Sequence, residues 1–147
     1  LGVSNTILDK PGKLNELEWE AVKSHAFLTE HILSHLGPFK QLAAVAGAHH
    51  EKLDGTGYPN RLVGNQISLS TRIITTADIF DAITAERPYR EAIPVSKTLQ
   101  IMEENLHTAI DERCFDALKA AIHKLPSHYF VSEGDLQLSW LPLQFLC

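Results

Sequence analysis

Cysteine is scarce in this sequence. The 147 residues contain two, Cys114 and Cys147, which lie far apart in the chain. This spacing excludes a disulfide-stapled scaffold and a CxxC metal site. A reducing cytoplasm is therefore the expected location.

Basic residues and long apolar runs are also in short supply. Lys and Arg total 13 against 18 Asp and Glu, and the formal net charge of −5 argues against binding to duplex DNA. No stretch approaches the roughly 20 apolar residues of a membrane helix, and no signal-peptide pattern is present at the start, so no membrane association is expected in this segment. The sequence begins with Leu1 rather than Met, which predicts that it is a piece of a longer protein.

What is present predicts one all-α globular domain. The composition is 44% hydrophobic and 21% charged, enough to bury a core. Apolar periodicity between Gly and Pro breaks predicts about five helices, at 16–36, 42–48, 69–86, 95–105 and 112–124. Residues 54–66 hold too many glycines and prolines for an element interior and predict an ordered loop. The pattern of 126–147 leaves a linker, a partner-binding tail and a strand pair open.

Three histidines are expected to face the interior. His25 lies on the apolar stripe of the first long helix, and His49 continues the apolar spacing of the run 42–48. His50 is offset from His49 by about 100°, so it reaches the same point only where that point lies beside the helix end. Each histidine taken singly is more often a hydrogen-bonded core residue than a metal ligand.

The helix at 69–86 adds two carboxylates to this interior. Asp78 and Asp81 are spaced i,i+3 on an otherwise apolar segment, and a buried carboxylate requires a cation nearby. Asp81 is expected to have a structural role, whereas Asp78 joins the three imidazoles. Imidazole plus carboxylate suits iron, manganese, zinc or nickel. Glu51 is expected to orient a histidine ring through its other nitrogen.

The segment from His49 to Pro59 reads HHEKLDGTGYP and resembles the HHExxDGxGYP signature of the HD-GYP domain family at every defining position. The resemblance continues at 10–14, 23–25, 76–82 and 87–90. It covers about residues 1–124, which it identifies as the C-terminal portion of an HD-GYP-type domain. The tail at 125–147 is unmatched and its role is open.

The resemblance implies a helical bundle of the HD superfamily type that hydrolyses cyclic di-GMP with two or three metal ions, often iron or manganese. It implies that the metal ligands are His25, His49, His50 and Asp78. Substrate contacts are implied for the loop and for two arginines further on, namely Asp54, Gly55, Gly57, Tyr58, Pro59, Arg87 and Arg90. Glycines allow the loop backbone unusual conformations, and Tyr58 offers an aromatic face and a hydroxyl. The arginines are equally well explained as solvated charges at a helix end.

One feature of the family is missing from these residues. Its His-Asp dipeptide, whose carboxylate bridges two metals, does not occur, because none of the eight histidines precedes an aspartate. Two-metal hydrolysis needs ions about 3.5–4 Å apart. We therefore expect a cyclic di-GMP phosphodiesterase in the parent protein and little or no activity in this chain, which would hold at most one ion loosely.

Other interpretations stay open. The parent is expected to be a bacterial signalling output domain, with a receiver or sensor domain upstream. Alternatively, the chain is a non-catalytic module that binds a related nucleotide or a partner such as a diguanylate cyclase domain. A third interpretation treats the inward His and Asp side chains as polar core residues of a remnant, whose exposed apolar surface would favour homodimers.

Overall fold

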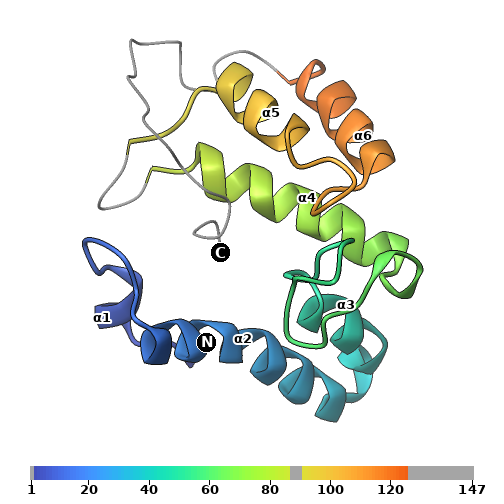
Figure 1. The fold of residues 1–147 in the computed structure, drawn as a ribbon. Coiled ribbons are helices and arrows are strands. Elements are labelled where there is room, and N and C mark those ends of the chain that lie inside the picture. The colour runs from blue at the N-terminus through green and yellow to red at the C-terminus, as the bar shows by residue number, and fades with distance from the viewer. Residues whose placement is uncertain (1, 87–90, 126–147) are drawn as a thin grey trace.

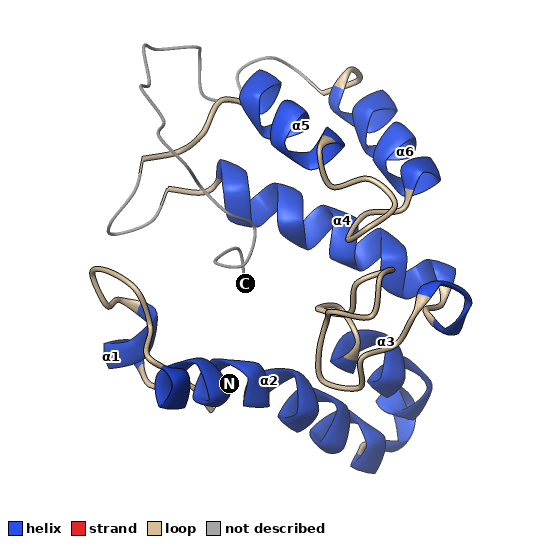
Figure 2. Ribbon diagram, viewed as in Figure 1, coloured by secondary structure: helices blue, strands red, loops and turns tan. Residues whose placement is uncertain are grey.

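The structure is a computed structural model that describes residues 2–86 and 91–125. Within these ranges every regular element is helical, which confirms the all-α prediction (Figure 2). The elements in chain order are α1 (Asn5–Leu8), α2 (Glu16–His35), the 3-10 turn η1 (Gly37–Leu42), α3 (Ala43–Gly47), the 3-10 turn η2 (Gly64–Gln66), α4 (Leu69–Thr84), α5 (Val95–Glu103) and α6 (Glu112–Ile122).

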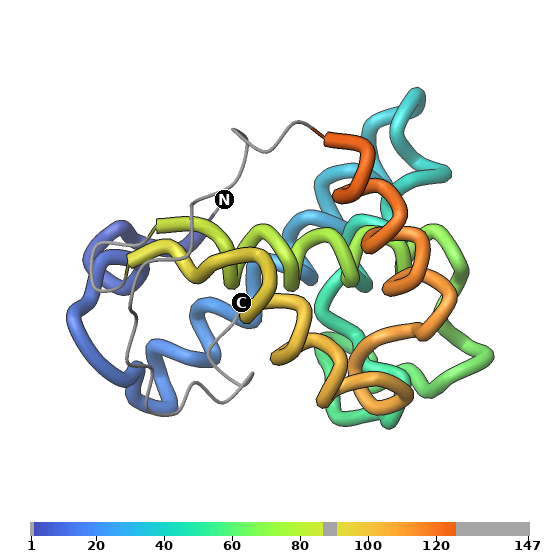
Figure 3. Tube along the Cα trace, turned by 90° about the horizontal axis from the view of Figure 1, so that it is seen from above, coloured from blue at the N-terminus to red at the C-terminus, as the bar shows by residue number. Residues whose placement is uncertain are grey.

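Two groups of helices are joined through α4, which contacts α3 of one group and α5 and α6 of the other. Helix α2 packs against η1 and α3 on one side, while α5 and α6 pack against α4 on the other (Figure 1). Helix α3 contacts both α2 and α4, and the loop that follows it lies between these two long helices. The view from above in Figure 3 shows the same arrangement, with α5 and α6 over α4.

The main apolar core lies between α4, α5 and α6. Ile83, Met102 and Ile110 have no measurable exposure, and Phe115 is 1% exposed. Burial of side chains of this size contributes about 1.5–3 kcal/mol each. The α2 and α3 side buries only small residues, Val22, Ala26 and Ala43 among them. The histidine segment therefore sits beside the core rather than inside it.

Helix α2 begins where the sequence predicts. Asn15 accepts a hydrogen bond from the backbone N–H of Glu18, and the Glu18 carboxylate accepts one from Asn15 in return. This capping box satisfies two of the N–H groups that have no partner inside the helix. Pairing with Lys10 then draws the Glu18 pKa below its usual range.

The run 42–48 forms the short helix α3, whose ends lie within one residue of the predicted bounds. The 3-10 turn that starts at Gly37 and Pro38 extends to Leu42 and leads into this helix. The first eleven residues contain one helical turn, α1, whose N-cap Ser4 accepts from Thr6 N–H. The tail at 126–147 and the arginines Arg87 and Arg90 lie outside the described residues. None of the described helices has the length and apolar character needed to cross a membrane.

Candidate metal centre

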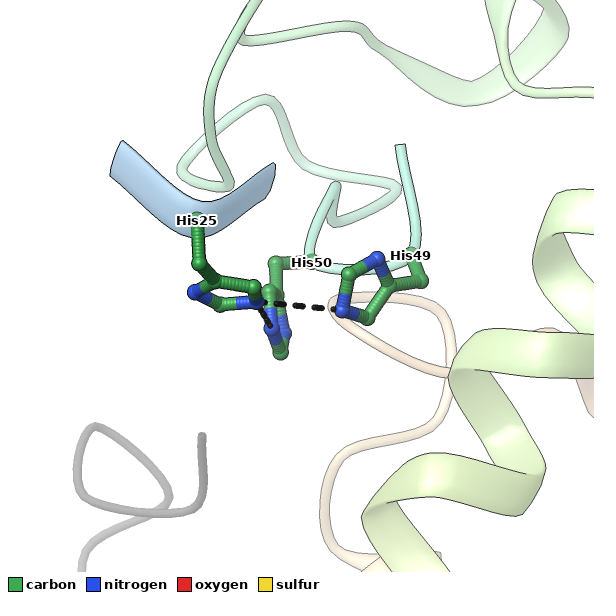
Figure 4. Close-up of side chains that lie close together, drawn as sticks. All are labelled: His25, His49 and His50. Carbon is green, nitrogen blue, oxygen red and sulfur yellow. Dashed lines mark hydrogen bonds between the residues drawn. The ribbon is translucent and has the colours of Figure 1, made fainter. Parts of the chain in front are cut away.

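Three imidazole rings meet at one point between α2 and the turn that follows α3 (Figure 4). The Nε2 atom of His25 lies 3.4 Å from Nε2 of His49 and 3.0 Å from Nε2 of His50. One ring nitrogen from each residue falls within 4.8 Å of the other two. We call these three side chains the histidine cluster. The predicted convergence of residues 25, 49 and 50 is therefore present in the structure.

The backbone fixes which nitrogen faces the centre of the cluster. His25 Nδ1 bonds the carbonyl of Val22, and His49 Nδ1 bonds the carbonyl of Ala46 at 2.6 Å. A carbonyl oxygen only accepts, so Nδ1 is the donor in both rings, and in the neutral tautomer that this bond selects Nε2 carries the lone pair. Two lone pairs 3.4 Å apart repel each other unless a cation lies between them. This arrangement is the one that a metal ion requires.

His50 is the most enclosed of the three rings. It is 8% exposed, and this burial, reinforced by the neighbouring rings of His49 and His25 and by Lys52, lowers its pKa to about 3. His50 is therefore neutral near pH 7. A neutral imidazole is the form that binds a metal ion.

Asp78 on α4 approaches the cluster from the other side of His50. Its Oδ2 atom lies 3.9 Å from His50 Nδ1, beyond hydrogen-bond distance, and its side chain is 40% exposed. The carboxylate thus lies beside the nitrogen of His50 that faces away from His25. The structure brings Asp78 next to the histidine cluster but not among its three ligand atoms.

The GYP loop, residues 54–66, is anchored by a carboxylate next to the cluster. Glu51 is 1% exposed, and its two oxygens accept hydrogen bonds from the backbone N–H groups of Asn60 and Leu62, at 2.6 and 2.8 Å. The prediction that Glu51 orients a histidine ring is wrong in this structure. Both oxygens instead satisfy loop donors that would otherwise be buried without partners, and the carbonyls of Val22 and Ala46 hold the rings of His25 and His49.

Gly57 and Tyr58 bring the loop onto the histidine backbone. A Cβ atom on Gly57 would lie 2.4–2.6 Å from backbone atoms of residues 50–52, so only glycine fits there. The next residue, Tyr58, donates its N–H to the carbonyl of His50 at 3.2 Å. The two ring centroids are 4.8 Å apart. Tyr58 therefore forms one wall of the histidine cluster. The motif predicts that Tyr58 contributes to the site but not that its ring lies against His50.

The remaining predicted residues of the loop and of α4 lie further from the rings. Asp54 is exposed and caps its own turn, accepting from the N–H and the hydroxyl of Thr56 at 2.9 and 2.7 Å. Gly55 has a positive φ of 81°, which suits glycine at this turn. Pro59 follows a cis peptide bond and is half-buried. The Asp81 side chain is exposed on α4, one turn beyond Asp78.

Three residues outside the predicted motifs support the site. Arg72 on α4 donates to the carbonyls of Gly64 and Ile67 at the end of the loop and pairs with Asp111 at 2.8 Å. Thr75, also on α4 and buried, donates its hydroxyl to the carbonyl of His49 at 2.8 Å.

Trp19 on α2 is the third, and it meets the Tyr58 ring edge-to-face with centroids 6.1 Å apart. For Thr75 the sequence offers a weak signal, the spacing of Thr71 and Thr75 by one helical turn along α4. Trp19 and Arg72 carry no such signal, because the Tyr58 ring and the Asp111 carboxylate that they contact each lie 39 residues away in the sequence.

The donor set fits a divalent transition metal. Three imidazoles with a carboxylate alongside are ligands that suit zinc, iron, manganese or nickel. His25 and His49 are half-buried and His50 is buried, so the cluster is enclosed on one side and reachable on the other. The imidazoles of the cluster can therefore hold one such ion, and Asp78 stands where it can supply negative charge.

Comparison with known proteins agrees with this chemistry. Residues 4–114 match the HD domain family. The chain is 70% identical over 129 residues to the 3'3'-cGAMP-specific phosphodiesterase 3 of Vibrio cholerae, covering 88% of this chain and 28% of that protein. It is 40% identical over 120 residues to a cyclic di-GMP phosphodiesterase response regulator of Xanthomonas campestris, covering 80% of this chain and 32% of that protein.

A solved structure of a cyclic GMP-AMP specific phosphodiesterase of Vibrio cholerae is 62% identical, with a TM-score of 0.45, and the match covers 87% of this chain and 28% of that one. The chain thus spans roughly 28–32% of the length of these relatives. The family match extends over most of the chain and includes the histidine cluster. This protein belongs to the HD domain family, and its relatives include phosphodiesterases of the HD-GYP type.

Proposed function

We propose that this chain forms the metal-binding part of a cyclic dinucleotide phosphodiesterase. The single observation that carries the proposal is the convergence of three Nε2 atoms from His25, His49 and His50. The names of the relatives support the reaction class and two related substrates, cyclic di-GMP and 3'3'-cGAMP. Both substrates contain two phosphodiester linkages and purine bases, so the same chemistry serves either one.

The three imidazoles would hold one iron or manganese ion, with Asp78 beside them as a further ligand or as a partner of His50. Such an ion supplies a more acidic bound water and stabilises negative charge on the phosphoryl oxygens. The protein supplies the rest: the carbonyls of Val22 and Ala46 hold two rings in the binding orientation, and Thr75 holds the backbone of His49.

The GYP loop would bind the substrate beside the cluster. Tyr58 stands against His50 and offers an aromatic face, a surface on which purine bases stack with a stabilisation of about 1–3 kcal/mol. Gly57 allows the loop backbone to approach, while Asp54, Gly55 and Pro59 set the turn. Arg87 and Arg90, predicted to contact phosphate, stay predictions because they lie outside the described residues.

We further propose that these 147 residues alone turn over little substrate. They contain no His-Asp dipeptide, and the described residues contain one cluster of three metal-binding side chains. A two-ion clamp needs a second set of ligands placed about 3.5–4 Å from the first ion. The same observation favours a second candidate, a non-catalytic module that binds a cyclic dinucleotide or a signalling partner.

The test is anaerobic loading of the purified chain with Fe(II) or Mn(II), followed by chromatographic assay of cyclic di-GMP and 3'3'-cGAMP hydrolysis. We expect metal binding that is lost in His25→Ala and kept in the control His123→Ala, which changes an exposed histidine at the end of α6. Metal binding that survives His25→Ala overturns the assignment of the cluster. Rapid turnover by the chain supports the phosphodiesterase assignment but refutes the proposal that these 147 residues alone have little activity.

A further inference from the structure

Helix α2 carries a second pair of imidazoles outside the histidine cluster. His31 and His35 are both exposed and lie four residues apart, one helical turn. Their ring centroids are 4.6 Å apart with an interplanar angle of 56°. The family match and the proposed chemistry assign no role to this pair.

Neighbouring groups already orient both rings. His35 Nδ1 lies 2.7 Å from the carbonyl oxygen of His31, so Nδ1 is the donor and Nε2 keeps its lone pair. The Ser34 hydroxyl lies 3.2 Å from the same Nδ1 atom. One turn earlier, Phe27 stacks nearly parallel to the His31 ring, with an interplanar angle of 17°. Because the rings are partly ordered beforehand, a ligand that bridges them loses less side-chain entropy.

We propose that His31 and His35 chelate one divalent ion of the late transition series, such as Cu(II), Ni(II) or Zn(II). Imidazole is a ligand that these ions favour, and affinity for a given nitrogen site rises towards Cu(II). Two histidines at i and i+4 present their rings on one helix face, the spacing found in helical zinc sites. The exposed position leaves the remaining coordination positions to water, so the ion exchanges readily.

This site is separate from the histidine cluster. His31 follows His25 by six residues, which is about 9 Å along the helix axis and a rotation of about 240°. The His25 ring is half-buried and faces His49 and His50, whereas the His31 and His35 rings are exposed. The two sites therefore share no ligand, and each can be removed by mutation without removing the other.

The competing explanation is that the pair only stabilises the end of α2. His35 lies in the last turn, where a protonated imidazole interacts favourably with the helix dipole and contributes about 0.3–1 kcal/mol. That role needs no metal and no contribution from His31. It predicts that Cu(II) binds no more tightly here than at an isolated exposed histidine.

Isothermal titration of the metal-free 147-residue chain with Cu(II) tests the proposal, with pulsed electron paramagnetic resonance to count coordinated imidazoles. We expect two classes of tight site in the unaltered chain. His31→Gln and His35→Gln should both remove the same class of site, with at least about a tenfold loss of affinity there. The double variant should lose no more affinity than either single variant, because a chelate needs both rings.

Two controls separate this result from general copper binding. His123→Gln removes an isolated exposed histidine and should leave both classes intact, while His25→Ala should remove the other class and leave a signal from two imidazoles. Circular dichroism of each variant checks that α2 still folds. The proposal is overturned if His31→Gln and His35→Gln keep both classes, or if His123→Gln weakens binding by the same factor.

Discussion

The Oε2 atom of Glu51 accepts a hydrogen bond from the backbone N–H of Leu62, eleven residues further along the chain, at 2.8 Å. The other carboxylate oxygen accepts from the N–H of Asn60. This buried carboxylate therefore holds the GYP loop next to the histidine cluster through two hydrogen bonds. Its neighbour His50 belongs to that cluster, so consecutive residues of the motif supply a cluster histidine and a loop anchor.

Replacing Glu51 with Gln should destabilise the protein. The amide keeps one acceptor oxygen but places an NH₂ group against a backbone donor, so one buried N–H loses its partner at a cost of about 1–3 kcal/mol. Urea unfolding of Glu51→Gln and of Glu104→Gln, an exposed control, measures the difference. An equal midpoint for both variants would show that the loop does not depend on this carboxylate.

Gly57 should tolerate no side chain. In Gly57→Ala the new Cβ would lie 2.4–2.6 Å from backbone atoms, so the loop must move away from His50 at a cost of about 1–3 kcal/mol. The matched control is Gly37→Ala, where a Cβ would meet nothing within 4 Å. Thermal unfolding should separate the two variants clearly. If Gly37→Ala proves the more harmful change, the close approach of the loop backbone is refuted.

Asp111 should make stability depend on pH at the acid end. Burial by itself raises the pKa of this carboxyl, but the hydrogen bond from Arg72 and those from Cys114 and Arg113 N–H groups outweigh it, so the pKa lies below its ordinary value of 3.8. A lowered folded-state pKa gives stability that is present above pH 3.8 and is lost as the pH falls through the folded value.

Asp111→Asn should therefore lose about 1.5–3 kcal/mol at neutral pH, because the charged partner of Arg72 is gone. The gap to the unaltered chain should shrink as the pH falls below 3.8 and through the folded-state pKa, because the native carboxylate then also becomes protonated. Urea midpoints measured from neutral pH down through this acid range test this, and Asp116→Asn, an exposed member of an i,i+3 pair with Lys119, is the control. A gap that is independent of pH would contradict the role of the Arg72 pair.

The part of the site that sequence predicts is the part set by helical periodicity. The capping pair Asn15 and Glu18 fixes the start of α2, and from there the 3.6-residue repeat places His25 on the face that meets His49. Periodicity predicts the face of the helix on which a side chain lies, but not how close that side chain comes to its neighbours. It therefore places Asp78 towards the cluster without showing that the carboxylate stops 3.9 Å from His50 Nδ1.

The contacts that sequence did not predict join a side chain to a backbone group in the GYP loop or at its end. Glu51 binds loop N–H groups, and Arg72 binds the carbonyls of Gly64 and Ile67. Any segment of the chain supplies such backbone donors and acceptors, so no residue type marks them.

The most direct test of the central claim is X-ray absorption spectroscopy of the chain loaded with one equivalent of iron. Coordination by the histidine cluster predicts scattering from three imidazole nitrogens, all bound through Nε2. His49→Ala should reduce this number to two and weaken iron binding, while His123→Ala should change neither. A spectrum with oxygen ligands only, or one unaltered by His49→Ala, would contradict the account.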